Sequence, residues 1–499
     1  METLIGSANR GSVSTEGYQI ENSCLFDSAS SHRMYFNPDS TSSTAEMRKG
    51  TISFWVKRTT ITHSQNMRIF HFGENTDGYD SRLEIEFKAD DTMFFYPILT
   101  MTTEKVFRDP SAWYHIVWFF DCTQAEQSGG SNHAIGNNAQ CGLWVNGVRI
   151  GNDNGLPAAN TNGRTHNSVA GWGRTTADKH AIGYDYLDNT GAFNGYLAEF
   201  HAIQELALEA TDFGEFNDDG IWVPIEYEGT AYGTNGFYLK FDDSSDMGKD
   251  SSSEGNDFTL VNMAAANQME DSPTNNFCTL NPLMRSDPDS VSTTQTISMG
   301  NLKMSMSGTP AGYSTIGATM FVGSGKWYYE LKIVTGGEGN ELGAFAQLVF
   351  DADSPDMRGY NNRTSLAWEF STYGSTYHYD ETNNWYSNHL AGLGHPPYHG
   401  TYTGYILLMA LDMDNGNVWV GYGGEDGEIT GSNPGNWDGA SSPRWERTTA
   451  AQSASAQGDP GNNLYPTNYG LGTNASTKQV WSIIERGITL AGVGFIWGG

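Results

Sequence analysis

The stretch from Trp113 to Ile150 constrains the fold more than any other part of the chain. It contains the run Trp-Tyr-His-Ile-Val-Trp-Phe-Phe-Asp, a long polar loop, and then Cys-Gly-Leu-Trp-Val-Asn-Gly-Val-Arg-Ile. An Asn-Gly dipeptide between alternating apolar residues predicts a tight β-hairpin, because both turn residues need positive φ. Asn146 and Gly147 are therefore expected to form a two-residue turn.

The turn determines which hairpin residues face each other. Trp144 and Arg149 are expected to lie opposite each other on one face and to stack as a cation–π pair. The other face is apolar, and its facing pairs are Val145 with Val148 and Leu143 with Ile150. A strand, a loop and an amphipathic hairpin of this kind are typical of a β-sandwich.

Alternation elsewhere in the first half predicts further half-buried antiparallel strands. The apolar positions that alternate with polar or outward residues are Ile52, Phe54 and Val56 in one run, and Leu83, Ile85 and Phe87 in another. The chain also has 59 glycines, 13% aromatic residues and only 17% charged residues, a composition of strands and turns rather than long helices. At 499 residues it is long enough for roughly two to four domains.

Four motifs in order resemble the core strands of laminin G-like, concanavalin-type lectin jelly rolls. They are Thr-Ile-Ser-Phe-Trp-Val-Lys, Trp-Tyr-His-Ile-Val-Trp-Phe-Phe-Asp, Leu-Trp-Val-Asn-Gly-Val and Gly-Tyr-Leu-Ala-Glu-Phe. The resemblance covers about residues 21–215 and implies an all-β jelly roll. Proteins of this family use the fold for glycan binding, protein binding and particle structure, so the resemblance leaves the function open.

A second strand-rich region covers residues 277–499. Gly-Lys-Trp-Tyr-Tyr-Glu-Leu-Lys-Ile-Val and a late hairpin around Asn415-Gly416 resemble SPRY domains, which are also concanavalin-like sandwiches. If Asn415 and Gly416 form the turn, one apolar face is predicted for Met409, Leu411, Met413, Val418 and Val420. Segments 351–403 and 423–480 depart from the SPRY pattern. The predicted architecture is thus two tandem concanavalin-like β-sandwich (jelly-roll) domains.

Two segments lie outside these sandwiches. Residues 1–20 are expected to form an N-terminal arm, either extended along a neighbour or disordered. Residues 216–276 are expected to form a connecting segment of strands and loops that packs on one or both domains. This segment resembles phage structural proteins with a laminin G-like domain, through Tyr-Gly-Thr-Asn-Gly-Phe-Tyr-Leu-Lys-Phe and Ser-Pro-Thr-Asn-Asn-Phe-Cys-Thr-Leu-Asn-Pro-Leu.

The formal net charge of −31 comes from scattered acidic residues. Such a surface repels phosphate backbones and anionic membranes, so we expect neither nucleic acid nor a membrane as partner. The first residues lack a basic start followed by an apolar core, and no later run is apolar enough to cross a bilayer. The expectation is a protein made without a secretion signal.

Glu84 and Glu86 are the clearest candidates for a catalytic pair, because residues two apart on a strand point to one face. Concanavalin-fold endoglucanases carry acids at three alternating positions, but the third position here is Lys88. We interpret the pair as part of a solvated sheet face, and we expect no enzymatic activity.

Metal binding is considered only for Ca²⁺, and no other cofactor is expected. Loop Asp and Asn side chains supply the oxygen ligands that Ca²⁺ prefers. The candidate ligands are Asp242, Asp243 and Asp246 in the acidic loop; Asp412 to Asn417 partly resembles a calcium loop, but its Asn-Gly turn explains it without metal.

The four cysteines show no zinc-binding spacing. Cys122 and Cys141 each sit at the loop end of a predicted strand, so a disulfide between them is a hypothesis. Cys24 and Cys278 are interpreted as buried or incidental thiols.

Aromatic residues crowd a segment of the second region that is rich in Asn, Ser, Thr and Gly. Exposed Tyr and Trp can stack on sugar faces, and they also make good protein interfaces. Packing of the loops is the alternative. The candidate ligand-binding residues are Tyr377, Tyr379, Trp385, Tyr386 and Tyr398.

Together these features predict a non-enzymatic virion structural protein of a tailed bacteriophage, located in the virion after assembly in the host cytoplasm. It would be a tail fibre, tail tip or capsid-surface decoration component. The expected partners are other virion proteins, further copies of the chain in a homo-oligomer, with a trimer favoured, and host-surface glycans. The alternatives are a free carbohydrate-binding lectin and a concanavalin-fold glycan hydrolase.

Overall fold

The structure is a computed structural model of the chain, which divides into two compact units, Met1–Asn276 and Phe277–Gly499. In unit 1 it describes residues 17–61, 63–72, 83–96, 101–124, 141–150, 169, 171–177, 179–186 and 189–276. In unit 2 it describes 277–285, 294–307, 314–321, 326–335, 344–349, 367–371, 375–379, 385–389, 406–412, 417–423, 479–484 and 489–495. The unit boundary falls where the predicted second region begins.

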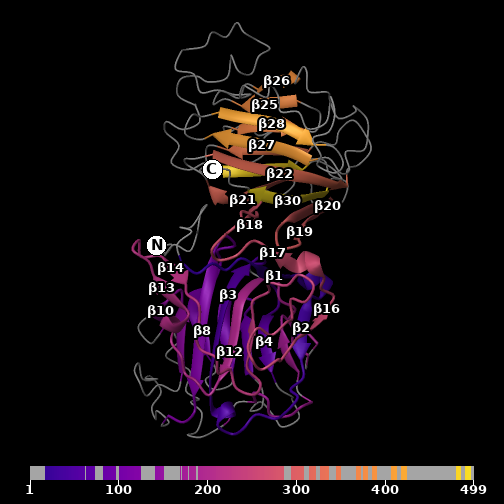
Figure 1. Cartoon of the computed structure of the whole chain (residues 1–499). Coiled ribbons are helices and arrows are strands. Elements are labelled where there is room, and N and C mark those ends of the chain that lie inside the picture. The colour runs from indigo at the N-terminus through magenta and orange to yellow at the C-terminus, as the bar shows by residue number, and fades with distance from the viewer. Residues whose placement is uncertain are drawn as a thin grey trace. The chain divides into compact units, whose positions relative to one another are not determined.

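Unit 1 is built from two antiparallel sheets (Figure 1). The strands of the first, sheet A, are β1 (Ser23–Phe26), β3 (Lys49–Arg58), β8 (Trp113–Asp121), β9 (Cys141–Val145), β10 (Val148–Ile150), β12 (Gly195–Gln204), β15 (Phe237–Leu239) and β17 (Gln268–Met269). They lie in the order β10-β9-β8-β3-β12-β1-β17, and β15 also pairs with β12.

The second sheet of unit 1, sheet B, has seven strands. They are β2 (Arg33–Phe36), β4 (Met67–Phe72), β5 (Leu83–Phe87), β6 (Thr92–Tyr96), β7 (Met101–Val106), β11 (His180–Ile182) and β16 (Thr259–Val261). Their order is β16-β2-β11-β4-β5-β6-β7.

Smaller elements complete the described part of unit 1. The pair β13 (Gly214–Phe216) and β14 (Trp222–Pro224) forms a separate hairpin, and the short 3-10 turns are η1 (Ser28–Ser30), η2 (Glu46–Arg48), η5 (Ala210–Asp212) and η6 (Ala265–Asn267). Among the described residues, no helix is long and apolar enough to cross a membrane.

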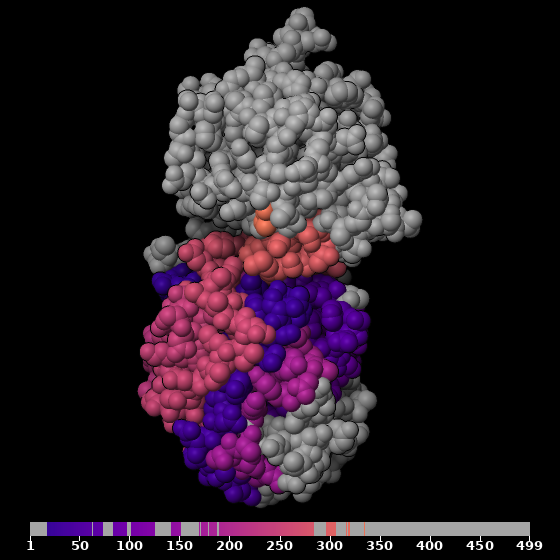
Figure 2. All heavy atoms as spheres, turned by 90° about the vertical axis from the view of Figure 1, so that its right-hand side faces the viewer, coloured from indigo at the N-terminus to yellow at the C-terminus, as the bar shows by residue number. Residues whose placement is uncertain are grey.

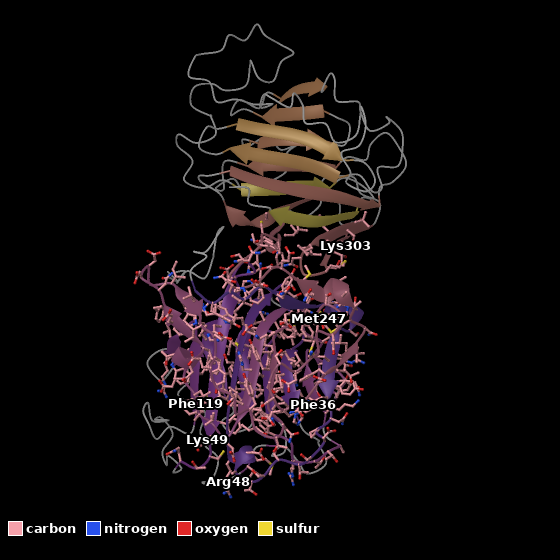
Figure 3. The ribbon with its side chains drawn as sticks, in the orientation of Figure 1. Phe36, Arg48, Lys49, Phe119, Met247 and Lys303 are labelled. Atoms are coloured by element: carbon pink, nitrogen blue, oxygen red, sulfur yellow. The ribbon has the colours of Figure 1, made fainter. Side chains whose placement is uncertain are left out.

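The two sheets enclose one apolar core. Phe54 of β3 stacks on Phe200 of β12 with ring centroids 5.0 Å apart, and Phe70 of β4 in the opposite sheet lies 5.3 Å from the same Phe200 ring. Figure 3 labels Phe36 and Met247, which belong to this main core. Aromatic and aliphatic side chains from alternate positions of both sheets fill the space, as a jelly-roll sandwich requires. The predicted all-β sandwich is confirmed.

The opening hairpin has the predicted geometry. Asn146 and Gly147 both have positive φ, at 49° and 74°, and the register pairs Val148 with Val145 and Ile150 with Leu143. The Arg149 guanidinium lies 5.1 Å from the Trp144 ring, so the cation–π pair forms. Gly147 has a second reason to be glycine, since a Cβ there would overlap the ring of Trp222.

A second apolar cluster covers the outward face of sheet A. It contains Trp55, Trp113 and Phe119 of the sheet, the last labelled in Figure 3, and it continues into Phe213 and Trp222 of the segment that follows β12. Figure 2 shows this later segment, in pink, spread over unit 1 beside the indigo N-terminal residues. The predicted connecting segment 216–276 therefore belongs to unit 1, and its Trp222 packs in the second apolar cluster.

A buried polar contact holds the end of that segment. Lys57 Nζ lies 2.7 Å from an Asp271 carboxylate oxygen and donates to Asn276 Oδ1 at 2.8 Å. The Trp113 indole donates to the other Asp271 oxygen at 3.0 Å. Lys57 and Asp271 are fully enclosed, so this contact, which we call the Lys57–Asp271 clasp, depends on charge pairing.

Unit 2 also consists of two antiparallel sheets. One has the order β18-β21-β29-β23-β24-β25-β26, formed by β18 (Leu280–Arg285), β21 (Ser314–Phe321), β23 (Ala344–Val349), β24 (Ala367–Ser371), β25 (Ser375–Tyr379), β26 (Trp385–His389) and β29 (Gln479–Ile484). The other has the order β19-β20-β30-β22-β27-β28, formed by β19 (Thr294–Ser298), β20 (Lys303–Ser307), β22 (Lys326–Thr335), β27 (Ile406–Asp412), β28 (Asn417–Gly423) and β30 (Thr489–Phe495).

The late hairpin of unit 2 is described in its two strands, β27 and β28. Its register pairs Asp412 with Asn417 and Leu411 with Val418. Asn415 and Gly416 lie outside the described residues, but the described register leaves four residues between Asp412 and Asn417, where a two-residue turn would pair Asp414 with Asn417. The pairing of Met409 with Val420 keeps the predicted apolar positions opposite one another.

Candidate functional site

The outward face of sheet B carries a row of unusual side chains across five strands. The register pairs Tyr35 with Ala181, Ala181 with His71, His71 with Glu84, and Glu84 with Tyr96. An imidazole and a carboxylate thus lie at the centre of the sheet, with a tyrosine on either side. Because these residues alternate with core residues such as Ile85, the row faces away from the apolar core.

A β-bulge in β4 puts two polar residues of that strand on this face. Arg68 pairs with Glu86 and Phe70 with Ile85, so the register shifts at Ile69. Without the bulge, residues 68 and 71 would point to opposite faces. Ile69 and Phe70 both remain buried in the core while Arg68 and His71 reach the same polar group.

His71, Glu84 and Asp185 form the centre of this group, with Arg68 and Glu86 beside them; we call the five the carboxylate cluster. His71 Nε2 lies 3.8 Å from Glu84 Oε1 and 3.7 Å from Asp185 Oδ1. Arg68 Nη2 lies 3.8 Å from Glu84 Oε1, and Arg68 Nε lies 3.4 Å from Asp185 Oδ2. The exposed fractions of His71, Glu84 and Asp185 are 1%, 1% and 0%.

Glu86 has a different set of partners. One of its carboxylate oxygens contacts Arg68 Nη1, and the other accepts a hydrogen bond from Asn66 Nδ2 at 2.8 Å. Both oxygens of Glu86 are therefore engaged by donors within the protein. Its role in the cluster is to pair with Arg68.

Asp185 reaches the cluster from the turn that follows β11. The Asp185 N–H donates to the Thr190 carbonyl, and the Arg68 N–H donates to the Gly191 carbonyl at 2.7 Å, so this turn folds back on β4. Asp185 is buried by this arrangement, whereas its neighbours Tyr184 and Tyr186 remain partly exposed.

Tyr184 and Tyr186 join Tyr35 in a partly exposed group that we call the tyrosine cluster. The Tyr186 ring lies 5.1 Å from Tyr35 and 5.5 Å from Tyr184. Lys179 Nζ is 4.3 Å from the ring centroids of both Tyr35 and Tyr186. Arg33 lies 4.5 Å from the Tyr184 ring and donates from Nε to the Tyr186 hydroxyl at 3.1 Å.

Phe94 and Tyr96 lie on the other side of the carboxylate cluster. They stack with centroids 6.4 Å apart, and both are partly exposed. The outward face of sheet B therefore has a buried polar centre between two partly exposed aromatic groups.

The outward face of sheet A holds a serine and a histidine in contact, but their chemistry is structural. The Trp222 indole donates to His115 Nδ1 at 3.0 Å, and Ser53 Oγ lies 3.0 Å from His115 Nε2. An indole N–H can only donate, so Nδ1 is the unprotonated nitrogen and Nε2 donates to Ser53. His115 thus cannot take a proton from Ser53. Burial lowers the pKa of His115 to about 3, which keeps the imidazole neutral.

The interpretation of Glu84 and Glu86 as a solvated pair is wrong. Their exposed fractions are 1% and 3%, because the cluster encloses them. The prediction that they share a face is confirmed by their pairing with His71 and Arg68. Alternation along one strand indicates the face but not what covers it.

The candidate calcium ligands do not gather in the structure. Asp242 and Asp246 are exposed, and the Asp243 carboxylate accepts from the Ser245 N–H and hydroxyl in a local turn. These Ser245 hydrogen bonds also lower the pKa of Asp243. In the described part of the chain, only His71, Glu84 and Asp185 bring three ligand atoms within 4.8 Å of one another.

The hypothesis of a Cys122–Cys141 disulfide does not agree with the structure, in which both cysteines are buried thiols outside any disulfide. Cys141 pairs with Phe120, so Cys122 is offset by two residues along the neighbouring strand. Such diagonal neighbours are separated by about 7–8 Å, beyond the usual reach of a disulfide. The Cys141 thiol instead contacts the Met101 sulfur at 3.7 Å.

The aromatic candidates of unit 2 lie mostly on a hairpin at a sheet edge rather than in loops. β25 pairs with β26, which places Tyr379 opposite Trp385, His378 opposite Tyr386 and Tyr377 opposite Ser387. Tyr398 lies outside the described residues. Ligand binding by these residues stays a prediction.

Sequence patterns did not indicate His71, Asp185 or the tyrosine cluster. Asp185 joins the cluster from more than a hundred residues after Glu84, and the bulge at Ile69 breaks the alternation that would have placed His71. The available signal was Gly-Tyr-Asp-Tyr at 183–186, where an acid between two tyrosines follows a glycine with a φ of 82°.

No protein-family model matches the chain, and no curated protein matches its sequence. Solved structures of similar shape include a protein from Bacteroides ovatus assigned to carbohydrate binding, at 14% identity and a TM-score of 0.29, over 49% of this chain and 58% of that protein. The SPRY domain of human HERC1 aligns at 12% identity and a TM-score of 0.25, over 44% of this chain and 99% of the domain.

A heptameric pentraxin from Limulus polyphemus aligns at 14% identity and a TM-score of 0.25, over 38% of this chain and 80% of that one. Of the Bacteroides protein, the chain spans little more than half the length. TM-scores this low say nothing about function. The fold is therefore assigned from the strand order of the sheets, and a function is proposed from the site alone.

Proposed function

We propose that the chain is a non-enzymatic carbohydrate-binding protein and that the outward face of sheet B, at the tyrosine cluster, takes the sugar. The observation that carries this proposal is the partly exposed group of Tyr35, Tyr184 and Tyr186 with two cationic side chains among them. Tyrosine offers an apolar ring for the C–H face of a sugar and a hydroxyl for its polar edge.

The cations supply the polar part of such a site. Arg33 and Lys179 are donors without acceptor atoms, so they suit sugar hydroxyl oxygens. Their contacts with the rings hold them in place before any ligand arrives, which reduces the entropy lost on binding. Together the rings and donors make a prearranged polar and aromatic surface.

The carboxylate cluster supports a binding role over hydrolysis. A glycosidase needs one carboxyl group that protonates the leaving oxygen and a second that attacks or activates water, and both must touch the sugar. Glu84 and Glu86 are almost fully enclosed, and Glu86 is held by Arg68 and Asn66. Release of reducing sugar that is lost in Glu84→Gln or Glu86→Gln would replace this proposal with the hydrolase alternative.

A glycan array of bacterial-surface and animal glycans, followed by calorimetry with the glycans that bind, tests the site. Tyr35→Ala and Tyr186→Ala should each weaken binding by up to about tenfold, since a stacked aromatic contact is worth about 0.5–1.5 kcal/mol. Phe216→Ala is the matched control, because Phe216 is an exposed aromatic residue on the separate hairpin β13–β14. No bound glycan, or an equal loss in the control, would contradict the proposal.

The more specific proposal is that the protein works in the virion of a tailed bacteriophage, as a tail fibre, tail tip or capsid-surface component. It is supported by the resemblance of 232–241 and 272–283 to phage structural proteins. The first of these stretches includes β15, and the second contributes Asn276 to the Lys57–Asp271 clasp. Residues of both stretches therefore contribute to the structure of unit 1.

Mass spectrometry of purified particles tests the virion role. The chain should be found in particles in several copies per virion, together with other virion proteins, and native mass spectrometry should show a homo-oligomer, with a trimer favoured. Particles without the chain, alongside free protein in the lysate, would favour the lectin alternative.

A further inference from the structure

We propose that His71, Glu84 and Asp185 bind one divalent transition-metal ion, with Zn²⁺ as the best fit. The three donors come from β4, β5 and the turn after β11, and their ligand atoms lie within 4.8 Å of one another. The site lies next to the proposed sugar surface, but it is tested without sugar, so the two proposals can fail separately.

The spacing of the three donors suits a shared ion better than direct contact. His71 Nε2 is 3.8 Å from Glu84 Oε1 and 3.7 Å from Asp185 Oδ1, which is too long for a hydrogen bond. An ion about 2.2 Å from both atoms of either of these two pairs would see them about 115–120° apart, near the angles of a tetrahedral site. The ligand atoms of all three residues lie within 4.8 Å of one another, so one ion can lie between them.

The donor types decide the class of metal. One imidazole and two carboxylates form a mixed nitrogen and oxygen set, as in zinc sites with three protein ligands and an open fourth position. Ca²⁺ and Mg²⁺ prefer six or more oxygen ligands and no imidazole. The set therefore favours Zn²⁺, with Mn²⁺ next.

The surroundings also resemble those of a metal site. Arg68 Nε lies 3.4 Å from Asp185 Oδ2, the oxygen that does not face His71, so it orients the carboxylate from behind. Ala181, which pairs with His71, has the smallest side chain in the row. The protein thus holds the three donors in place within an enclosed cluster.

Calorimetry of the EDTA-treated, dialysed full chain with Zn²⁺ alone, in buffer with 150 mM salt and excess Mg²⁺, tests the site. The expected result is one Zn²⁺ per chain, a higher melting temperature, and binding at least a hundredfold weaker in His71→Gln, Glu84→Gln and Asp185→Asn. Glu86→Gln is the matched control, since it removes the same charge from the same face and should weaken binding less than tenfold.

Two results would overturn the site: no heat with Zn²⁺ or Mn²⁺, or an equal loss in Glu84→Gln and Glu86→Gln, which would indicate non-specific binding to an acidic surface. If the variants do not fold, X-ray absorption of the zinc-loaded wild type decides. A spectrum with only nitrogen and oxygen ligands around the zinc would support the site. Sulfur ligands would place the ion at cysteines instead.

Discussion

The free energy of unfolding of an Asp271→Asn variant should be about 3–5 kcal/mol lower than that of the wild type. Removing one partner of a buried ion pair leaves the other charge unpaired. Lys57 would remain enclosed beside β12, with its ammonium 2.8 Å from the amide oxygen of Asn276. The Trp113 indole would also lose a charged acceptor. The clasp holds the end of segment 216–276, so its loss should loosen the packing of the second apolar cluster.

Hydrogen exchange of the full chain, read by mass spectrometry on peptides from β3 and β12, measures this change within unit 1. Glu270→Gln is the matched control, because Glu270 is the exposed neighbour of Asp271 and the substitution removes the same charge. The free energy of unfolding of this control should lie within about 0.5 kcal/mol of the wild-type value. Equal destabilisation in both variants would mean that net charge, not the clasp, sets the effect.

The second large effect is a loss of stability in mild acid. Burial lowers the pKa of both His115 and His180 to about 3, well below the value of about 6.5 in an unfolded chain. Between these values the unfolded state binds protons that the folded state does not. Stability is therefore fully present above about pH 6.5 and falls as the pH drops below it.

From pH 7 to pH 5 each of these histidines should remove about 2 kcal/mol, and together about 4 kcal/mol. Urea unfolding at several pH values in this range measures how the free energy of unfolding changes with pH. His115→Gln keeps a donor and an acceptor for Ser53 and Trp222, so it should remove the part of the pH dependence that comes from His115, about 2 kcal/mol between pH 7 and pH 5. His63→Gln is the control, because His63 is partly exposed and bonded only to Gln65 among the described contacts. A flat profile in the wild type would contradict the prediction.

Local chemistry explains which parts of the fold could be predicted. The Asn146-Gly147 turn needs only positive φ at two residues, and the pairing of Trp144 with Arg149 follows from it. The second Asn-Gly dipeptide shows the limit of this reasoning, because the strands around it pair through Asp412 and Asn417 instead. Turn residues indicate a hairpin, but cross-strand packing chooses its register.

The candidate site was predicted only at Glu84 and Glu86. Their common face follows from a strand period of two, but His71 reaches it through a bulge and Asp185 through a distant turn. The Cys122–Cys141 hypothesis failed for the same reason, since two loop ends can be neighbours without facing each other.

The amino-acid sequence by itself determined that this protein is all-β, with a tight hairpin at Asn146 and strands whose alternate residues form a core. These properties depend on residues close together in the chain. Only the tertiary structure decided what covers the outward faces: the Lys57–Asp271 clasp over sheet A joins residues 214 positions apart, and the carboxylate cluster over sheet B depends on Asp185. Alternation separates the two faces of a strand, but burial of the outward one is set by distant segments.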